Sequence, residues 1–340
     1  MQPFMQKAGI MGSSQETLEL GLELGKVEGA IAPSREVVSN ARQVLSTEEL
    51  ATLNQRSTWQ GLWQLGKHLA VMAVSGTLWA TQMQTPWIAL PALVVYGFSL
   101  ASMFAAMHES VHRTAFASNR LNDFVGWLAG LLSFYNGTFY RRYHKWHHRY
   151  TQIPGKDPEL SDPKPQTRRD YWLELSAIPW WIGKLKTHLK IAAGKVQDYP
   201  FLPESAYADV IRSTRVQLGV YAGAIALSIL FGHPAAFFLY WALPLAVGQP
   251  LLRAILLAEH TGCTNDDNPF TNTRTTLTTF PIKLLMWNMP FHAEHHLYPS
   301  IPFHSLPAAY ERLSERWRYV EKGYIRVNQN IVADLKTAAE

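Results

Sequence analysis

The feature that most constrains the fold of this chain is a set of three tight histidine clusters. Two have the same His-x-x-His-His spacing, at residues 144–148 and 292–296, and the third is a pair of histidines four residues apart. Imidazole nitrogen is a frequent metal ligand, so we expect the fold to bring these distant segments together around metal. The clusters hold eight of the 13 histidines: His108, His112, His144, His147, His148, His292, His295 and His296.

The spacing within each triplet favours two neighbouring metal ions. On a helix, residues four apart share a face, whereas adjacent residues point about 100° apart. His144 and His148 would therefore face one way and His147 another. A single zinc ion takes three or four protein ligands, so eight imidazoles fit a pair of ions. Residue type alone leaves iron, zinc, copper and nickel open, and we infer iron because the site is rich in nitrogen, lacks thiolate and adjoins lipid.

Composition indicates a membrane protein. The chain is 47% hydrophobic and 17% charged, and it contains 12 tryptophans, a combination typical of proteins in contact with lipid. Cys263 is the single cysteine, which excludes an internal disulfide and a thiolate metal cluster. The net charge of +5 is explained better by membrane topology than by a nucleic-acid partner.

Four apolar segments approach the ~20 residues that cross a bilayer. Very short links without Lys or Arg join them in two pairs, whereas residues 141–215 are rich in both. The positive-inside rule then places both hairpins outward, and both termini and the three clusters in the cytoplasm. We expect an all-α, multi-pass integral membrane protein: four transmembrane helices in two hairpins, with a helical cytoplasmic cap that holds a di-metal histidine site. The four spans are residues 69–83, 87–107, 216–231 and 235–258.

The remaining sequence suggests three regions. Residues 1–63 read as an N-terminal cytoplasmic extension ending in an interfacial amphipathic helix, which starts at a capping-box pattern at Ser46–Glu49 and continues to Leu65. Residues 64–320 form the membrane domain, and residues 321–340 a C-terminal cytoplasmic tail. Shorter apolar pieces at 124–139, 171–182 and 277–291 would pack on the core or lie at the interface.

The three histidine clusters, called boxes from here on, lie at residues 108–112, 144–148 and 292–296. Their order around two hairpins resembles that in the integral-membrane fatty acid desaturase/hydroxylase family. Arg149-Tyr150-Thr151 after the second box and Asn288-Met289-Pro290-Phe291 before the third agree with it. The resemblance covers residues 64–319. It implies a non-haem di-iron centre that uses O2 and two electrons to remove hydrogens from an acyl chain, and it implies a ninth ligand, His260.

Differences from two branches of the family narrow this resemblance. The first box has three residues between its histidines, whereas acyl-CoA desaturases have four. The third box begins with His, whereas front-end desaturases have Gln there. A His-Pro-Gly-Gly haem motif is absent from the sequence, which implies a separate electron donor, a ferredoxin or a cytochrome. The boxes look most like those of bacterial acyl-lipid desaturases, including the dihydrorhizobitoxine desaturase-like branch, so we expect a fatty acyl or acyl-lipid substrate.

Carboxylates beside the boxes would hold the imidazoles in one tautomer by accepting the second ring N–H. The candidates are Glu109, Asp157, Glu159, Glu259 and Glu294. Gln249 and Arg253 interrupt the fourth span, and polar groups at membrane depth often line a cavity, so we expect them on a substrate tunnel. His68, His188 and His233 read as structural, and His304 as a surface or supporting residue.

Three alternatives remain open from sequence. His108-Glu109-x-x-His112 matches the HExxH of zinc metalloproteases, with Glu109 as general base, although this leaves both triplets unexplained. A membrane haem protein would need paired histidines on facing spans. Within the family, a hydroxylase or ketolase would share the first hydrogen abstraction and differ in the step that follows. We expect a desaturase.

Overall fold

The computed structural model describes residues 43–161 and 164–336, and this part of the chain is mostly helical. The helices are α3 (Thr47–Leu53), α4 (Thr58–Thr81), α5 (Pro86–Val111), α6 (Asn119–Ser133), α7 (Gly137–Tyr150), α8 (Arg168–Leu175), α9 (Ile178–Ala192), α10 (Tyr207–Leu230), α11 (Leu243–His260), α12 (Phe280–Leu285), α13 (His292–Leu297), α14 (Leu306–Leu313) and α15 (Tyr324–Asp334). A π-helical turn at Phe238–Ala242 precedes α11. Strands β1 (Thr275–Leu277) and β2 (Val320–Lys322) form a short parallel pair, which the all-α prediction missed.

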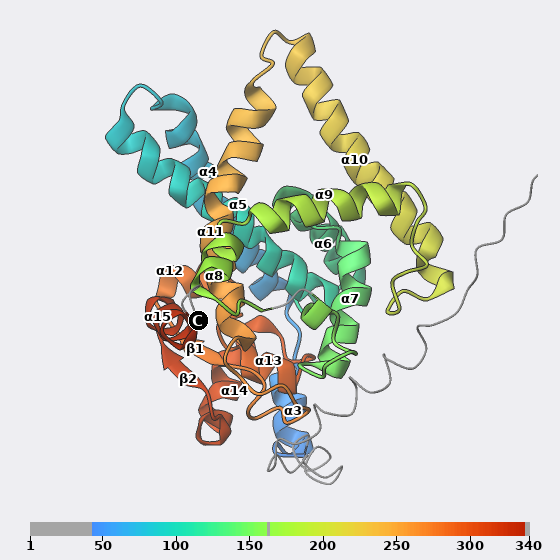
Figure 1. Cartoon of the computed structure of the whole chain (residues 1–340), viewed down its shortest axis with the longest axis vertical. Helices are drawn as coiled ribbons and strands as arrows, with labels where there is room; N and C mark the ends of the chain where they lie inside the picture. Colours follow the sequence, from blue (N-terminus) through green and yellow to red (C-terminus); the bar gives the residue numbers. More distant parts are fainter. Residues whose placement is uncertain (1–42, 162–163, 337–340) are drawn as a thin grey trace, which may run out of the picture.

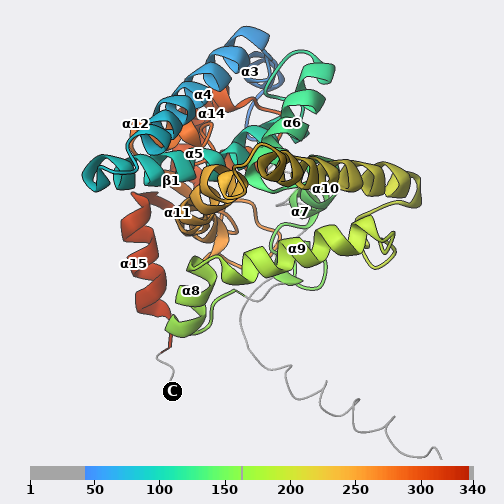
Figure 2. The same ribbon diagram turned by 90° about the horizontal axis from the view of Figure 1, so that it is seen from above.

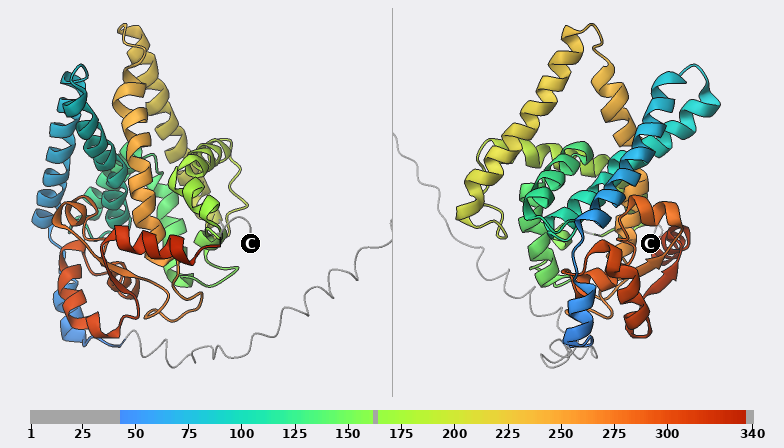
Figure 3. Two further views of the ribbon diagram at one scale, coloured as in Figure 1. Left: turned by 60° about the vertical axis from the view of Figure 1, so that its left-hand side comes forward. Right: turned by 180° about the vertical axis from the view of Figure 1, so that it is seen from behind.

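Two helical hairpins project from one side of the molecule, α4 with α5 and α10 with α11, and the remaining helices gather at the other end (Figures 1 and 3). Three helical segments are long and apolar enough to cross a membrane: Pro86–Val111, Glu204–Leu230 and Phe238–His260. They correspond to three of the four predicted spans. The remaining predicted span, residues 69–83, overlaps the second half of α4, and α4 is not among these three segments. α4 is 24 residues long, but Gln60, Gln64 and Lys67 make its first half polar.

The amphipathic helix predicted from Ser46 to Leu65 is two helices. The capping box at its start is present, because the Ser46 hydroxyl accepts from the Glu49 N–H at 3.2 Å and the Glu49 carboxylate accepts from the Ser46 N–H at 2.8 Å. The helix ends at Leu53, and a second cap at Ser57 starts α4. The tryptophan-rich stretch therefore belongs to the first hairpin. Residues 1–42 of the predicted extension lie outside the described residues.

The predicted boundary between residues 320 and 321 falls inside β2, and the segment that follows packs on the main core. Tyr324, Val327 and Ile331 of α15 are buried in the same hydrophobic cluster as Leu252 of α11. Asn328 donates a side-chain hydrogen bond to the Ala254 carbonyl of α11 at 3.0 Å. Residues 321–334 therefore support α11, the helix that ends at His260.

Helices α5 and α11 form the centre of the molecule, with α4 and α6 against α5 (Figure 2). α5 and α11 approach each other so closely that the backbones of Gly97 and Gly248 are in contact. A Cβ atom on Gly248 would overlap the Gly97 carbonyl. Small residues allow this packing between membrane helices. The contact fixes the ends of α5 and α11 relative to each other, and both ends carry histidines.

We predict that Gly248→Ala destabilises the protein by about 2–3 kcal/mol, because the added methyl group meets backbone atoms of α5, which cannot move aside as a flexible side chain could. Gly223→Ala on α10 is the matched control, since a Cβ there meets nothing within 4 Å, and its effect should stay within about 1 kcal/mol. Thermal unfolding of both variants in detergent measures the difference. Equal melting temperatures would show that the glycine contact is not tight.

Candidate metal centre

The fold brings all nine predicted histidine ligands into one cluster. α5 carries His108 and ends at His112, α7 carries the second box, α11 ends at His260, and α13 carries the third box. These four elements meet at the end of the molecule away from the tips of the hairpins (Figure 1). α7 is helical through its box, which is the condition under which the spacing predicted two ligand directions.

The nine rings divide into two groups. The first contains His108, His112, His144, His148 and His295, with ligand atoms within 4.8 Å of one another. The second contains His147, His260 and His296, and the His292 Nε2 lies 3.2 Å from the His260 Nε2. Each triplet is split between the groups: α7 gives two rings to the first and one to the second, and α13 does the reverse. The groups adjoin where the His148 and His296 ring centroids lie 4.3 Å apart.

The spacing of the ring nitrogens fits metal ligation. The His148 Nε2 lies 2.9 Å from the His144 Nε2 and 3.1 Å from the His295 Nε2. Two nitrogens bound to one ion at about 2.1 Å, at right angles, would lie about 3 Å apart. The Nε2 atoms of His108, His112 and His296 are buried and have no hydrogen-bond partner among the described residues. A metal ion would satisfy these buried lone pairs.

The rings are poised as neutral ligands. Burial, reinforced by neighbouring imidazoles, lowers the pKa of His144, His148, His292, His295 and His296 well below the ordinary value. Burial and the nearby Arg141 lower the pKa of His112 to about 3. His147 is the exception: burial acts against its charged form, but the carboxylates of Glu159 and Asp157 outweigh burial and raise its pKa.

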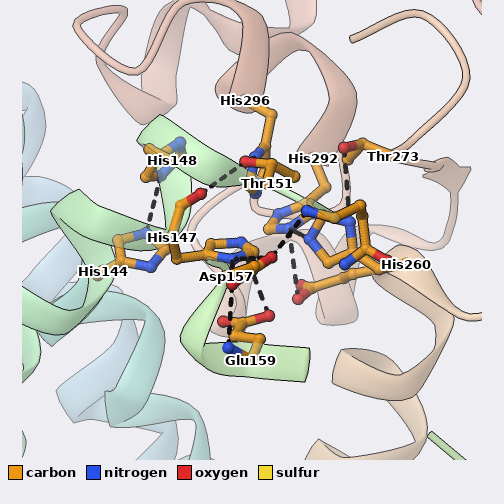
Figure 4. A network of polar contacts seen from close by, with 12 residues as sticks. His144, His147, His148, Thr151, Asp157, Glu159, His260, Thr273, His292 and His296 are labelled. Carbon is orange, nitrogen blue, oxygen red and sulfur yellow. Dashed lines mark hydrogen bonds and ion pairs between the residues drawn. The ribbon is translucent and has the colours of Figure 1, made fainter. Parts of the chain in front are cut away.

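Hydrogen bonds to the outer ring nitrogen orient several imidazoles (Figure 4). The His147 Nδ1–H donates to both Asp157 oxygens, at 2.9 and 3.0 Å. The His260 Nδ1–H donates to the Asn272 carbonyl at 3.0 Å. The Thr151 hydroxyl donates to the His147 carbonyl at 2.8 Å, so its oxygen accepts from the His296 Nδ1–H at 3.1 Å. Each bond leaves the Nε2 lone pair directed inward, as in second-shell support of metal sites.

The other four carboxylates do not contact an Nδ1 atom. Oxygens of Glu159 and Glu259 lie 3.6 Å and 3.5 Å from the Nε2 atoms of His147 and His292, on the side where a metal would bind. Glu109 accepts from the Phe303 N–H at 2.9 Å, and Glu294 accepts from the Thr275 hydroxyl at 2.6 Å. Burial raises the pKa of Glu294 to about 7 against this hydrogen bond. Glu109 and Glu294 thus brace the loops around the site. Thr151 and Asn272, which the sequence did not single out as supports, contact the rings directly.

A cavity of about 1120 Å³ adjoins both groups. His108 and His144 of the first group line it, as do His147, His260 and His292 of the second. Its wall also includes Arg253, but Gln249 does not line it. Gln249 is fully buried, and neither of its amide atoms has a partner among the described residues. Of the two residues predicted to line a substrate tunnel, only Arg253 lines this cavity.

The other histidines lie outside the cluster. The buried His68 ring uses both nitrogens, one with the Ser99 carbonyl at 2.8 Å and one accepting from Trp287 at 3.2 Å. His188 stacks on Phe134, and the His304 ring contacts the Ser305 hydroxyl.

Helices long and apolar enough to span a membrane, together with nine clustered imidazoles that could hold metal, are the features that define the class of this chain. A family model for fatty acid desaturases matches residues 85–328. The chain belongs to the fatty acid desaturase family and is an oxidoreductase. It is 26% identical over 272 residues to an sn-1 oleoyl-lipid 12-desaturase of Picosynechococcus sp., covering 73% of this chain and 76% of the relative.

Two other relatives differ in their named activity. A dihydrorhizobitoxine desaturase of Bradyrhizobium elkanii is 27% identical over 285 residues, covering 77% of this chain and 76% of the relative. A human sphingolipid delta(4)-desaturase/C4-monooxygenase is 25% identical over 250 residues, covering 70% and 68%. Every prediction of family and of enzyme class is confirmed by these similarities.

We predict that Thr151→Val lowers metal affinity about 10- to 100-fold, because the His296 ring loses the acceptor that fixes its tautomer. Thr151→Ser keeps the hydroxyl and is the matched control, with near-normal affinity. Chelator competition on purified protein measures both variants. Equal metal affinity in Thr151→Val and the natural chain would contradict this role for Thr151.

Proposed function

We propose that the protein is a membrane acyl-lipid desaturase that introduces a double bond into a fatty acyl chain with a non-haem di-iron centre and O2. The observation that carries this proposal is the division of nine imidazoles into two adjoining groups beside a cavity. The relatives named as lipid desaturases support a lipid-linked substrate.

The donor set is compatible with iron. The described ligand groups contain nitrogen donors and nearby carboxylates without thiolate, which suits iron, among other metals. We assign the first ion to His108, His112, His144, His148 and His295, and the second to His147, His260, His292 and His296. When bound, the two ions supply activation of O2 and removal of two hydrogens, with two electrons from a separate ferredoxin or cytochrome.

The chain's own residues would hold the acyl chain and limit water. Tyr140, Trp180, Leu256 and Met289 line the cavity beside the histidines and offer an apolar wall. The Tyr135 hydroxyl accepts from Arg253 at 2.8 Å and from Trp180 at 3.0 Å. Arg253 is thereby held against the wall, which leaves room for the substrate.

We further propose that α4 is the fourth membrane helix and that the histidine cluster and both termini are cytoplasmic. α4 pairs with α5 as α10 pairs with α11 (Figure 3). The clustered basic residues of 141–215 support the cytoplasmic side. A hairpin tip without Lys or Arg lies at residues 82–85, as an outer turn requires.

The alternatives fit less well. A zinc protease is disfavoured because His108 and His112 belong to a group of five rings, which is more than one zinc ion binds. Glu109 would be the general base of such a protease, but its carboxylate accepts a hydrogen bond from the Phe303 N–H. A hydroxylase or ketolase remains an alternative on the same scaffold, since one relative is named as both desaturase and monooxygenase.

Lipid analysis of a host that expresses the chain tests the reaction. We expect new double bonds, and new hydroxyl or keto products without double bonds would contradict a desaturase.

His295→Ala should reduce product at least about 100-fold, because it removes a ring from the first group, while membrane insertion is retained. His233→Ala, in the link between α10 and α11, is the control and should leave product formation unchanged. Normal activity of His295→Ala would refute the site assignment.

A further inference from the structure

A second cavity lies on the opposite side of α7 from the substrate cavity. Its volume is about 520 Å³, it is open to the outside, and it is bordered by the end of α5, by α6, by the start of α7 and by the start of α10. Thr138, Arg141 and Arg142 face it from α7, whereas Tyr140, Tyr143 and His144 face the substrate cavity. Neither the histidine cluster nor the proposed reaction uses this space.

The second cavity has an excess of positive charge. Four arginines line it, against two aspartates, Asp123 and Asp209. Asp123 pairs with Arg113 at 3.0 Å and with Arg141 at 2.9 Å. Arg142 and Arg212 make no ion pair within 4.0 Å among the described residues. Arg142 Nη1 donates to the Thr138 carbonyl at 2.6 Å, but a guanidinium carries five N–H donors, so both groups keep donors for an anion.

A buried hydroxyl provides an independent sign of a ligand. Ser110 lines the cavity and is only 1% exposed, yet its Oγ has no hydrogen-bond partner among the described residues. A buried hydroxyl without a partner is costly. It would be satisfied by a polar atom of a ligand that enters the cavity.

The position of the cavity favours a lipid as the source of an anionic ligand. Asp209, Arg212, Ser213 and Val216 line it from one face of α10, at spacings of three or four residues. The same face continues with Val220, which is exposed, along a helix apolar enough to span a membrane. Polar side chains thus give way to exposed apolar ones at the end of the span, where a lipid headgroup meets its acyl chains.

From these observations we propose that the cavity is a second lipid site, which binds the phosphate headgroup of an anionic membrane lipid. Guanidinium groups match phosphate geometry with paired hydrogen bonds, so Arg142 and Arg212 hold the phosphate and Ser110 donates to it. The acyl chains lie along Val216 and Val220. Because α7 carries the second histidine box, a lipid bound here braces the helix that supplies three metal ligands.

Binding of defined probes to the full chain in detergent tests the proposal. Dioctanoyl phosphatidic acid should bind the natural chain, and Arg142→Gln with Arg212→Gln should weaken it at least ~10-fold, since two charge-assisted contacts are lost. Arg120→Gln on α6 removes one positive charge outside the cavity, against two in the double variant, and should change affinity less than about twofold. Dioctanoyl phosphatidylcholine should bind more weakly, because its headgroup carries no net charge.

Further measurements separate the outcomes. Metal content and helicity of the double variant should match the natural chain, which shows that it is folded. Equal losses in the double variant and in Arg120→Gln would indicate nonspecific attraction and overturn the site. Inorganic phosphate that binds as tightly as the lipid would make this a free-phosphate site. A double variant that binds lipid normally but accepts electrons slowly from its donor would assign the arginines to a protein partner. Each of the last two results would refute the lipid assignment.

Discussion

The structure depends on directing the inner nitrogen of nine imidazoles into one small volume. Four helices contribute, and the turn of each helix that carries histidines must reach the same place for the rings to meet. α5 and α11 achieve this through the contact of Gly97 with Gly248, which fixes one helix against the other. Their last turns carry His108 and His260. The packing of α5 against α11, one helix from each hairpin, therefore sets the positions of histidines in both groups.

Sequence spacing could predict how the rings divide, because it follows from helical geometry. His144 and His148 share a face of α7, and the structure places them in one group with His147 in the other. The turns that bring the helices together left no such signal. Arg113 and Gln152 follow the first two boxes, Trp287 and Asn288 precede the third, and all have positive φ. Glycine usually occupies such positions, so a reader of the sequence has no mark for these turns.

The same geometry explains why the predicted supporting carboxylates were mostly misplaced. Glu109, Glu259 and Glu294 each stand next to a histidine in sequence, and adjacent residues on a helix point about 100° apart. None of them can contact the outer nitrogen of its neighbour. The partners that do so come from farther along the chain, where Asp157 reaches His147 and the Asn272 carbonyl reaches His260. A backbone carbonyl in a loop cannot be recognised from residue types.

The buried nitrogens also link metal binding to the stability of the cap. Without an ion, the Nε2 atoms of His108, His112 and His296 lack a partner among the described residues, and each such atom costs about 1–3 kcal/mol. The rings come from α5, which is long and apolar enough to span a membrane, and from α13, which the short β1–β2 pair supports. Because these elements share few other contacts near the rings, metal that binds the folded cluster and not the unfolded chain must stabilise their association. The site is thus a structural element of the cap as well as the place where its chemistry occurs.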